Sequence, residues 1–127
     1  MPTQSARPRF LQLLQIRQPI TAIVSITHRI SGVLLFLALP FAVAALHLSL
    51  RSEGDFLQVQ AWLATWPVRL IGIVLLWAIL HHFLAGIRFL LLDLDIGLSL
   101  KAARASAWAV LVAVGLLFVL LLIGALA

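Results

Sequence analysis

The chain has 127 residues, of which 64% are hydrophobic and only 10% are charged, and its formal net charge is +5. A soluble domain of this size could not bury so much apolar surface, so the composition indicates an all-α integral membrane protein without a large extramembrane domain. The chain has no cysteine, which excludes disulfides and cysteine-ligated iron–sulfur clusters within it. Its basic residues flank apolar segments and form no single solvated patch, so we expect no nucleic-acid partner.

The N-terminal segment, residues 1–19, is basic and interrupted by prolines. It has no apolar core followed by a small-residue cleavage site, so we do not expect it to be a signal peptide. We expect this segment to be retained and to lie at the cytoplasmic surface of the membrane.

Three apolar segments follow, and each is long enough to cross a bilayer as a helix. The whole chain is therefore expected to form one membrane-anchor domain with spans at residues 20–50, 68–92 and 105–127. The first span is longer than a bilayer requires, and Pro40 should kink it because proline removes a backbone donor and crowds the preceding turn.

Two shorter segments join the spans: residues 51–67, an outer connector with a candidate interfacial helix, and residues 93–104, a polar loop. Lysine and arginine are concentrated on the N-terminal side and around the second of these segments, at Arg7, Arg9, Arg17, Arg29, Arg88, Lys101 and Arg104. The first connector is flanked only by Arg51 and Arg69. The positive-inside rule then places the N-terminus and the polar loop in the cytoplasm and the C-terminus on the opposite side.

The dipeptide His81-His82 lies near the middle of the second span, where an imidazole is costly and therefore marks a functional site. Ala78, His82 and Gly86 recur every four residues and share one helix face. Small residues one turn above and below a histidine leave room for a flat ligand such as a porphyrin, whose iron commonly takes an axial histidine. Alternatively, His82 bonds a neighbouring helix and the small residues form a packing seam. His81 points about 100° away from His82, so both cannot serve one iron.

A low-spin haem needs two axial ligands. His28 is expected to be shallower in the membrane than His82, which is roughly 15 Å from the inner end of its helix. His47 lies near the outer end of the first span. The simplest second ligand is therefore a histidine from another subunit.

Ser25, Arg29 and Gly32 share a face of the first span, and His28 lies beside Arg29. Arg29 is either a topology anchor that reaches the interface or, with Ser25, a donor to a quinone carbonyl or a haem propionate. In the second span, Arg88 is a candidate ion-pair partner of Asp93, of a propionate or of lipid phosphate. Its simplest assignment is a positive-inside anchor.

Two stretches, RQPITAIVSITHRISGV and HHFLAGIRFLLLD, resemble the cytochrome b556 subunits of succinate dehydrogenase, the larger of that enzyme's two membrane anchors. The resemblance implies a heteromeric helix bundle in which haem b lies between two anchor subunits, each supplying one axial histidine. It assigns iron ligation to His82, the quinone site to Ser25 and Arg29, and the vicinity of the haem propionates to His28 and Arg29. The family's aspartate after G-I-R matches Asp93.

The chain also departs from the family pattern. That pattern often reads G-I-R-H, but Phe89 replaces the second histidine, so no role of that histidine carries over. His81 falls where relatives often carry an aromatic residue, and its role stays open.

The resemblance predicts a membrane anchor of succinate:quinone oxidoreductase, respiratory complex II of the tricarboxylic acid cycle, in a bacterial inner membrane. The implied partners are membrane lipids, a second small anchor, an iron–sulfur subunit and a flavoprotein subunit, with FAD and the iron–sulfur clusters confined to the last two. Ubiquinone would be reduced near the cytoplasmic face. The alternatives are a fumarate reductase anchor and a haem-free membrane scaffold.

Overall fold

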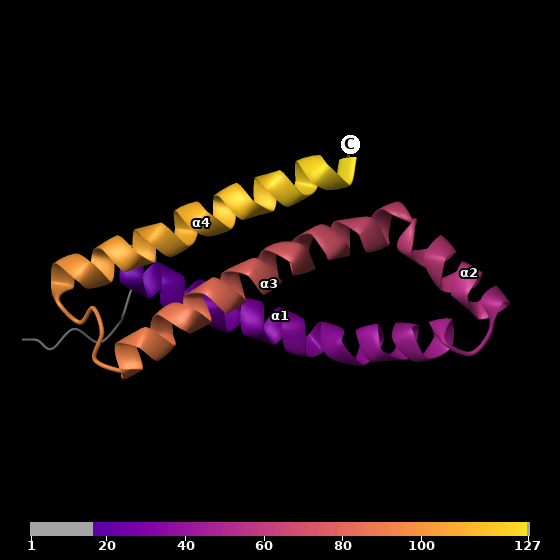
Figure 1. Cartoon of the computed structure of the whole chain (residues 1–127), viewed down its shortest axis with the longest axis horizontal. Coiled ribbons are helices and arrows are strands. Elements are labelled where there is room, and N and C mark those ends of the chain that lie inside the picture. The colour runs from indigo at the N-terminus through magenta and orange to yellow at the C-terminus, as the bar shows by residue number, and fades with distance from the viewer. Residues whose placement is uncertain (1–16, 127) are drawn as a thin grey trace, which may run out of the picture.

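The computed structural model describes residues 17–126, which form four helices and no strand (Figure 1). They are α1 (Ile20–Ser49), α2 (Glu53–Leu63), α3 (Trp66–Asp93) and α4 (Leu100–Leu126). Three of them, α1, α3 and α4, are long and apolar enough to cross a membrane, and each contains an 18-residue segment with a mean hydropathy of 2.1, 2.2 and 2.8, respectively. The prediction of an all-helical protein with three spans is confirmed. The expectations for the N-terminal segment fall mainly on residues 1–16, which lie outside the described range.

The segment between α1 and α3 contains the short helix α2, in the region where an interfacial helix was expected. Ser52 is its N-cap and accepts a hydrogen bond from the backbone N–H of Asp55 at 3.1 Å. Glu53 and Asp55 lie in the first turn, where carboxylates stabilise the helix dipole. Pro67 then occupies the first turn of α3, where its missing N–H leaves no bond unmade.

The polar loop is shorter than expected because α4 begins at Leu100 and so includes residues 100–104. Ser99 explains this earlier start. Its hydroxyl accepts a hydrogen bond from the N–H of Ala102 at 3.3 Å, and its carbonyl accepts one from Ala103 at 2.8 Å. Asp95 and Gly97, with φ of 60° and 83°, provide the left-handed backbone that reverses the chain between α3 and α4.

The helices pack mainly where α1 begins and α3 ends. The buried core there consists of Val24, Ala85, Ala107, Val110 and Val114. In Figure 1, α1 and α3 cross in this region, α4 lies along α3, and α2 joins the far ends of α1 and α3. Most large apolar side chains elsewhere are exposed, as expected for surfaces that contact lipid or other subunits.

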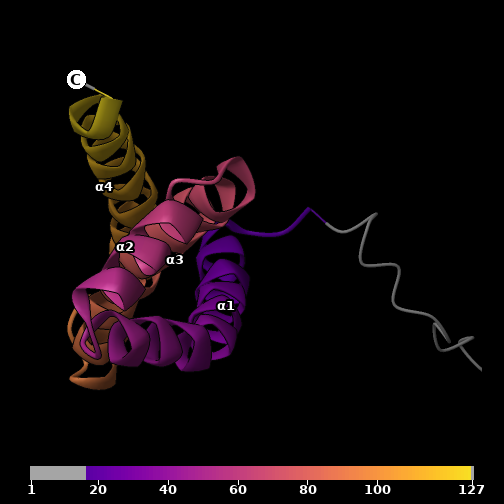
Figure 2. The same ribbon diagram turned by 90° about the vertical axis from the view of Figure 1, so that its right-hand side faces the viewer.

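The axis of α1 changes direction along its length, as Figure 2 shows from the end of the molecule. Pro40 lies inside this helix, which continues without interruption to Ser49. Because a proline removes one backbone hydrogen bond and crowds the preceding turn, it is the expected cause of such a bend.

Arg88 joins α3 to α4. Its side chain is only 5% exposed, its Nε donates to the Ser106 hydroxyl at 3.0 Å, and one terminal nitrogen donates to the Ala103 carbonyl at 3.1 Å. The guanidinium also lies over the ring of Phe89, 5.2 Å from the ring centroid. A buried cation is therefore held by neutral acceptors and an aromatic face from two helices.

Replacing Ser106 by alanine should destabilise this joint by about 1–3 kcal/mol, because Nε of Arg88 would lose its acceptor while remaining buried. The measurement is the midpoint of thermal unfolding of the purified protein in detergent. Ser49→Ala is the matched control, since that hydroxyl bonds only the Leu46 carbonyl of its own helix. Equal shifts in the two variants would contradict this role for Arg88.

Candidate functional site

The site lies where α1 and α3 cross, around His82. The imidazole rings of His28 and His82 stack with their centroids 4.2 Å apart and their planes 6° from parallel. The two rings are therefore in direct contact. Along the helices, His28 lies about 12 Å from the start of α1 and His82 about 16 Å from the end of α3, and the two side chains span this difference.

The hydrogen bonds of His82 define which of its nitrogens carries the proton. Nδ1 lies 3.2 Å from the backbone carbonyl of His28 and 3.3 Å from the Ser31 hydroxyl. A carbonyl can only accept, and the Ser31 hydroxyl already donates to the same carbonyl at 2.8 Å. Nδ1 must therefore be the donor, and the lone pair of the neutral ring lies on Nε2.

Nε2 of His82 is free to bind a ligand. It makes no hydrogen bond within residues 17–126, and the side chain is half-buried at the surface of the chain. A metal-binding histidine commonly donates its other ring N–H to a carbonyl, which orients the ring and raises its basicity. The His82 ring has this arrangement.

Glycine at position 32 allows the His82 ring to come so close to α1. A Cβ atom there would be only 2.9 Å from Cε1 of His82. Small residues also surround the ring on its own helix: Ala78 is fully buried, and a Cβ at Gly86 would be 3.6 Å from Nε2 of His28. The small residues that the sequence places one turn from His82 therefore lie at the crossing of α1 and α3.

His81, unlike its neighbour, is enclosed in the interior of the chain. It is 1% exposed, its Nε2 lies 2.7 Å from the Thr27 hydroxyl, and its ring stacks on Trp77 with centroids 5.4 Å apart. Of these two neighbours, only His82 combines a ring nitrogen without a hydrogen bond with access from outside the chain.

The other predicted site residues differ in exposure and in the contacts they make. Ser25 is half-buried and Arg29 is exposed, and the two residues lie one turn apart on α1. Ser25 precedes His28 by three residues and Arg29 follows it directly. Arg88 is brought to Ser106 and not to Asp93, and the ion pair found within residues 17–126 joins Arg51 to Asp55 at 3.8 Å.

Three contacts of the two histidines were not predicted from the sequence. Thr27 contacts His81, Ser31 contacts His82, and the His82 ring packs against Gly32. Their signal was available in the sequence. Thr27 and Ser31 are small hydroxyl residues one turn apart in an apolar span, so they share a face, and such residues commonly bond across helices in membranes.

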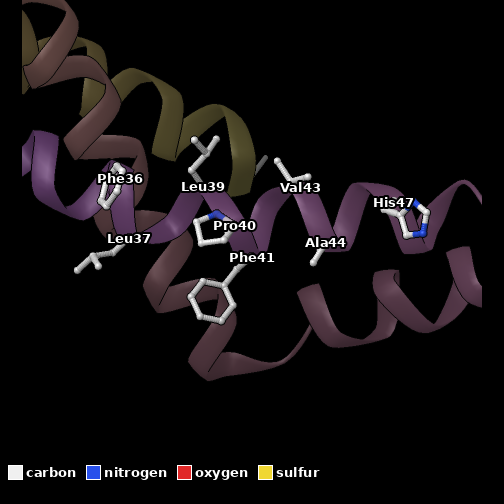
Figure 3. Close-up of a pocket in the computed structure, with 8 residues that line it drawn as sticks. All are labelled: Phe36, Leu37, Leu39, Pro40, Phe41, Val43, Ala44 and His47. Carbon is white, nitrogen blue, oxygen red and sulfur yellow. The ribbon is translucent and has the colours of Figure 1, made fainter.

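A separate apolar pocket of about 780 Å³ lies on the far half of α1, away from His82. Figure 3 shows the side chains that line it, all from α1: Phe36, Leu37, Leu39, Pro40, Phe41, Val43, Ala44 and His47. None of them belongs to the predicted site, and only His47 is ionisable. The pocket therefore offers no group of converging polar atoms.

The donor set limits what metal His82 could bind. Residues 17–126 contain no group of three or more histidine, cysteine or carboxylate side chains placed to hold a metal ion. A metal bound at His82 would therefore need ligands from outside these described residues, as a porphyrin or another subunit could supply.

Three helices long and apolar enough to cross a bilayer define a multi-pass helical membrane protein, and the crossing of α1 and α3 around His82 is its candidate binding site. Residues 3–122 match the family described as the succinate dehydrogenase/fumarate reductase transmembrane subunit, and the chain belongs to this family. The resemblance found from the two sequence motifs is thus confirmed.

Similar proteins include three succinate dehydrogenase cytochrome b556 subunits. The one from Coxiella burnetii is 39% identical over 107 residues, which are 84% of this chain and 86% of the relative. The one from Paracoccus denitrificans is 34% identical over 92% of this chain and 90% of the relative. The one from Rickettsia prowazekii is 32% identical over 91% of this chain and 90% of the relative.

Gly32→Ala should lower the thermal midpoint of the purified protein, because the added methyl displaces the His82 ring and overpacking costs about 1–3 kcal/mol. Gly72→Ala in α3 is the matched control, since nothing lies within 4 Å of a Cβ there. It should leave the midpoint unchanged or raise it slightly, as alanine is the better helix former. If Gly32→Ala behaved like the control, the close approach of His82 to α1 would be disproved.

Proposed function

We propose that this chain is a membrane anchor of succinate:quinone oxidoreductase in which His82 is an axial ligand of haem b. The observation that carries the proposal is the 3.2 Å contact between Nδ1 of His82 and the His28 carbonyl, which assigns the donor role to Nδ1 and leaves Nε2 as the ligand atom. When haem is bound, it would supply one-electron redox chemistry. Within this chain, His82 would bind the iron. His28, whose ring stacks on that of His82, would lie close to the haem propionates.

The choice of His82 over His81 rests on access. A haem shared between two subunits must meet its ligand at the surface of this chain. His82 is half-buried with Nε2 unengaged, whereas His81 is 1% exposed and its Nε2 is bonded to Thr27. His81 could bind iron only if α3 rotated and that bond broke.

The second axial ligand would come from another anchor subunit. His28 would not supply it, because its ring stacks on the face of the His82 ring, with 4.2 Å between the centroids, and does not lie beyond Nε2. This chain would therefore provide one half of a binding site, and a partner would provide the other half.

Ser25 and Arg29 would bind ubiquinone at the cytoplasmic end of α1. The hydroxyl and the guanidinium are donors one turn apart, and the exposed Arg29 can reach a ligand at the membrane boundary. Ser25 would donate to a quinone carbonyl. Arg29 would stabilise the negative charge that develops on the quinone oxygens during reduction.

The remaining chemistry belongs to other subunits. Electrons would arrive from the iron–sulfur subunit, which receives them from the flavoprotein, and protons would come from the cytoplasmic side of a bacterial inner membrane. The family description covers fumarate reductases as well, so an anchor that works in the opposite direction is the second candidate. The reduction potential of the haem and the kind of quinone used by the purified complex distinguish the two.

His82→Ala should remove the reducible b-type absorption spectrum from the purified complex, because the iron loses its ligand in this chain. His47→Ala is the control, since His47 is exposed on the far half of α1. It should keep the full spectrum.

The same spectra discriminate between the competing assignments. If His81→Ala lost the spectrum and His82→Ala retained it, the iron ligand would be His81 and our assignment of His82 would be wrong. A wild-type complex without any b-type absorption would favour the haem-free scaffold.

Ser25→Ala and Arg29→Ala should each lower quinone reduction roughly 10–100-fold, which corresponds to the loss of a hydrogen bond of about 1.5–3 kcal/mol. Succinate oxidation by a soluble artificial acceptor should be unchanged, because that reaction does not use the membrane site. Arg69→Ala, at another exposed arginine, is the control. Equal loss of both activities would indicate failed assembly and would not support a quinone site.

A further inference from the structure

His81 makes one polar contact, and that contact joins α3 to α1. Its Nε2 lies 2.7 Å from the hydroxyl of Thr27, while its other nitrogen, Nδ1, is buried without a partner within residues 17–126. The ring is also held by stacking on Trp77, one turn earlier on α3. A histidine that buries one unpaired nitrogen in an apolar interface depends strongly on the bond made by the other.

The direction of the bond follows from Thr27. Its hydroxyl lies 2.8 Å from the carbonyl of Ile23 and 3.2 Å from that of Val24, and it must donate to them because carbonyls only accept. Its oxygen is then left to accept from Nε2–H of His81. The two neighbouring histidines therefore carry their protons on opposite nitrogens, Nε2 in His81 and Nδ1 in His82.

Two contacts one turn apart hold α3 against the same face of α1. Thr27 engages His81, and Ser31, four residues later, engages His82. His81 and His82 are consecutive, and their side chains point about 100° apart around the axis of α3. The contact of His81 with Thr27 therefore fixes the rotation of α3 about its own axis, and this rotation determines where the His82 ring meets α1.

We propose that Thr27 and His81 form a positioning pair, which fixes the rotation of α3 against α1 and so holds the His82 ring with its Nε2 directed out of the chain. This inference rests on the proposed ligation of haem by His82. Neither member of the pair touches the iron. Both act through the orientation of their neighbour, as outer-sphere partners of metal ligands do.

The pair is tested by Thr27→Val, which keeps the shape of the side chain and removes the acceptor, and by His81→Phe, which keeps an aromatic ring against Trp77 and removes the donor. In the purified complex, each should release haem to excess apomyoglobin on the order of tenfold faster than wild type. Each should also shift the g values of the ferric haem in electron paramagnetic resonance, which report the orientation of the axial ligand.

Four variants give the internal controls. The double variant should release haem no faster than the faster single variant, because both substitutions break the same bond. Thr27→Ser and His81→Gln retain an acceptor and a donor and should behave like wild type. Thr65→Val removes an exposed hydroxyl that bonds only the Trp62 carbonyl, and it should have no effect.

Wild-type release rates and g values in Thr27→Val and His81→Phe would overturn the positioning role, as would effects that multiply in the double variant. If either of these variants fails to assemble, Thr27→Ser and His81→Gln decide: normal haem binding in both supports the pair, and rapid release in either overturns it. His82→Ala distinguishes a failure of the positioning pair from a failure of the proposed haem ligation. If it loses haem while Thr27→Val behaves like wild type, only the positioning pair fails; if it retains haem, the proposed function fails and the pair with it.

Discussion

The hydrogen bond from Nδ1 of His82 to the backbone carbonyl of His28 is the contact on which the rest of the site depends. It determines which nitrogen of His82 is free, and it requires the ring to approach α1 closely. Gly32 permits that approach, because any Cβ there would be 2.9 Å from the ring. Ser31 adds a second acceptor at 3.3 Å. The adjacent serine and glycine in the first motif therefore have one physical purpose, to receive the histidine of the second motif.

This contact divides the histidine pair into an inner and an outer member. His81 is enclosed by α1 and α3, and His82 presents an open nitrogen at the chain's surface. The small core and the many exposed apolar side chains agree with a chain that is one part of a larger bundle. Membership of the succinate dehydrogenase/fumarate reductase transmembrane subunit family fits this picture, because such a subunit works in an assembly.

Hydrophobic length predicted the three spans well, because a bilayer imposes that length on any spanning helix. The helical period also predicted that His81 and His82 point in different directions, and the two side chains have different surroundings in the structure. The contacts between spans could not be predicted in the same way. Their register depends on how two helices cross, which brought His28 into contact with His82 and turned Arg88 toward Ser106. The early start of α4 depended on one capping serine that composition does not reveal.

The most direct test of the account is a high-resolution structure of the complete complex by electron cryo-microscopy. We expect haem iron bonded to Nε2 of His82 at about 2 Å, with Nδ1 within hydrogen-bonding distance of the His28 carbonyl and a histidine of another subunit on the opposite face. Iron bonded to His81 or His28, or a His82 ring turned so that Nδ1 faces the iron, would contradict it.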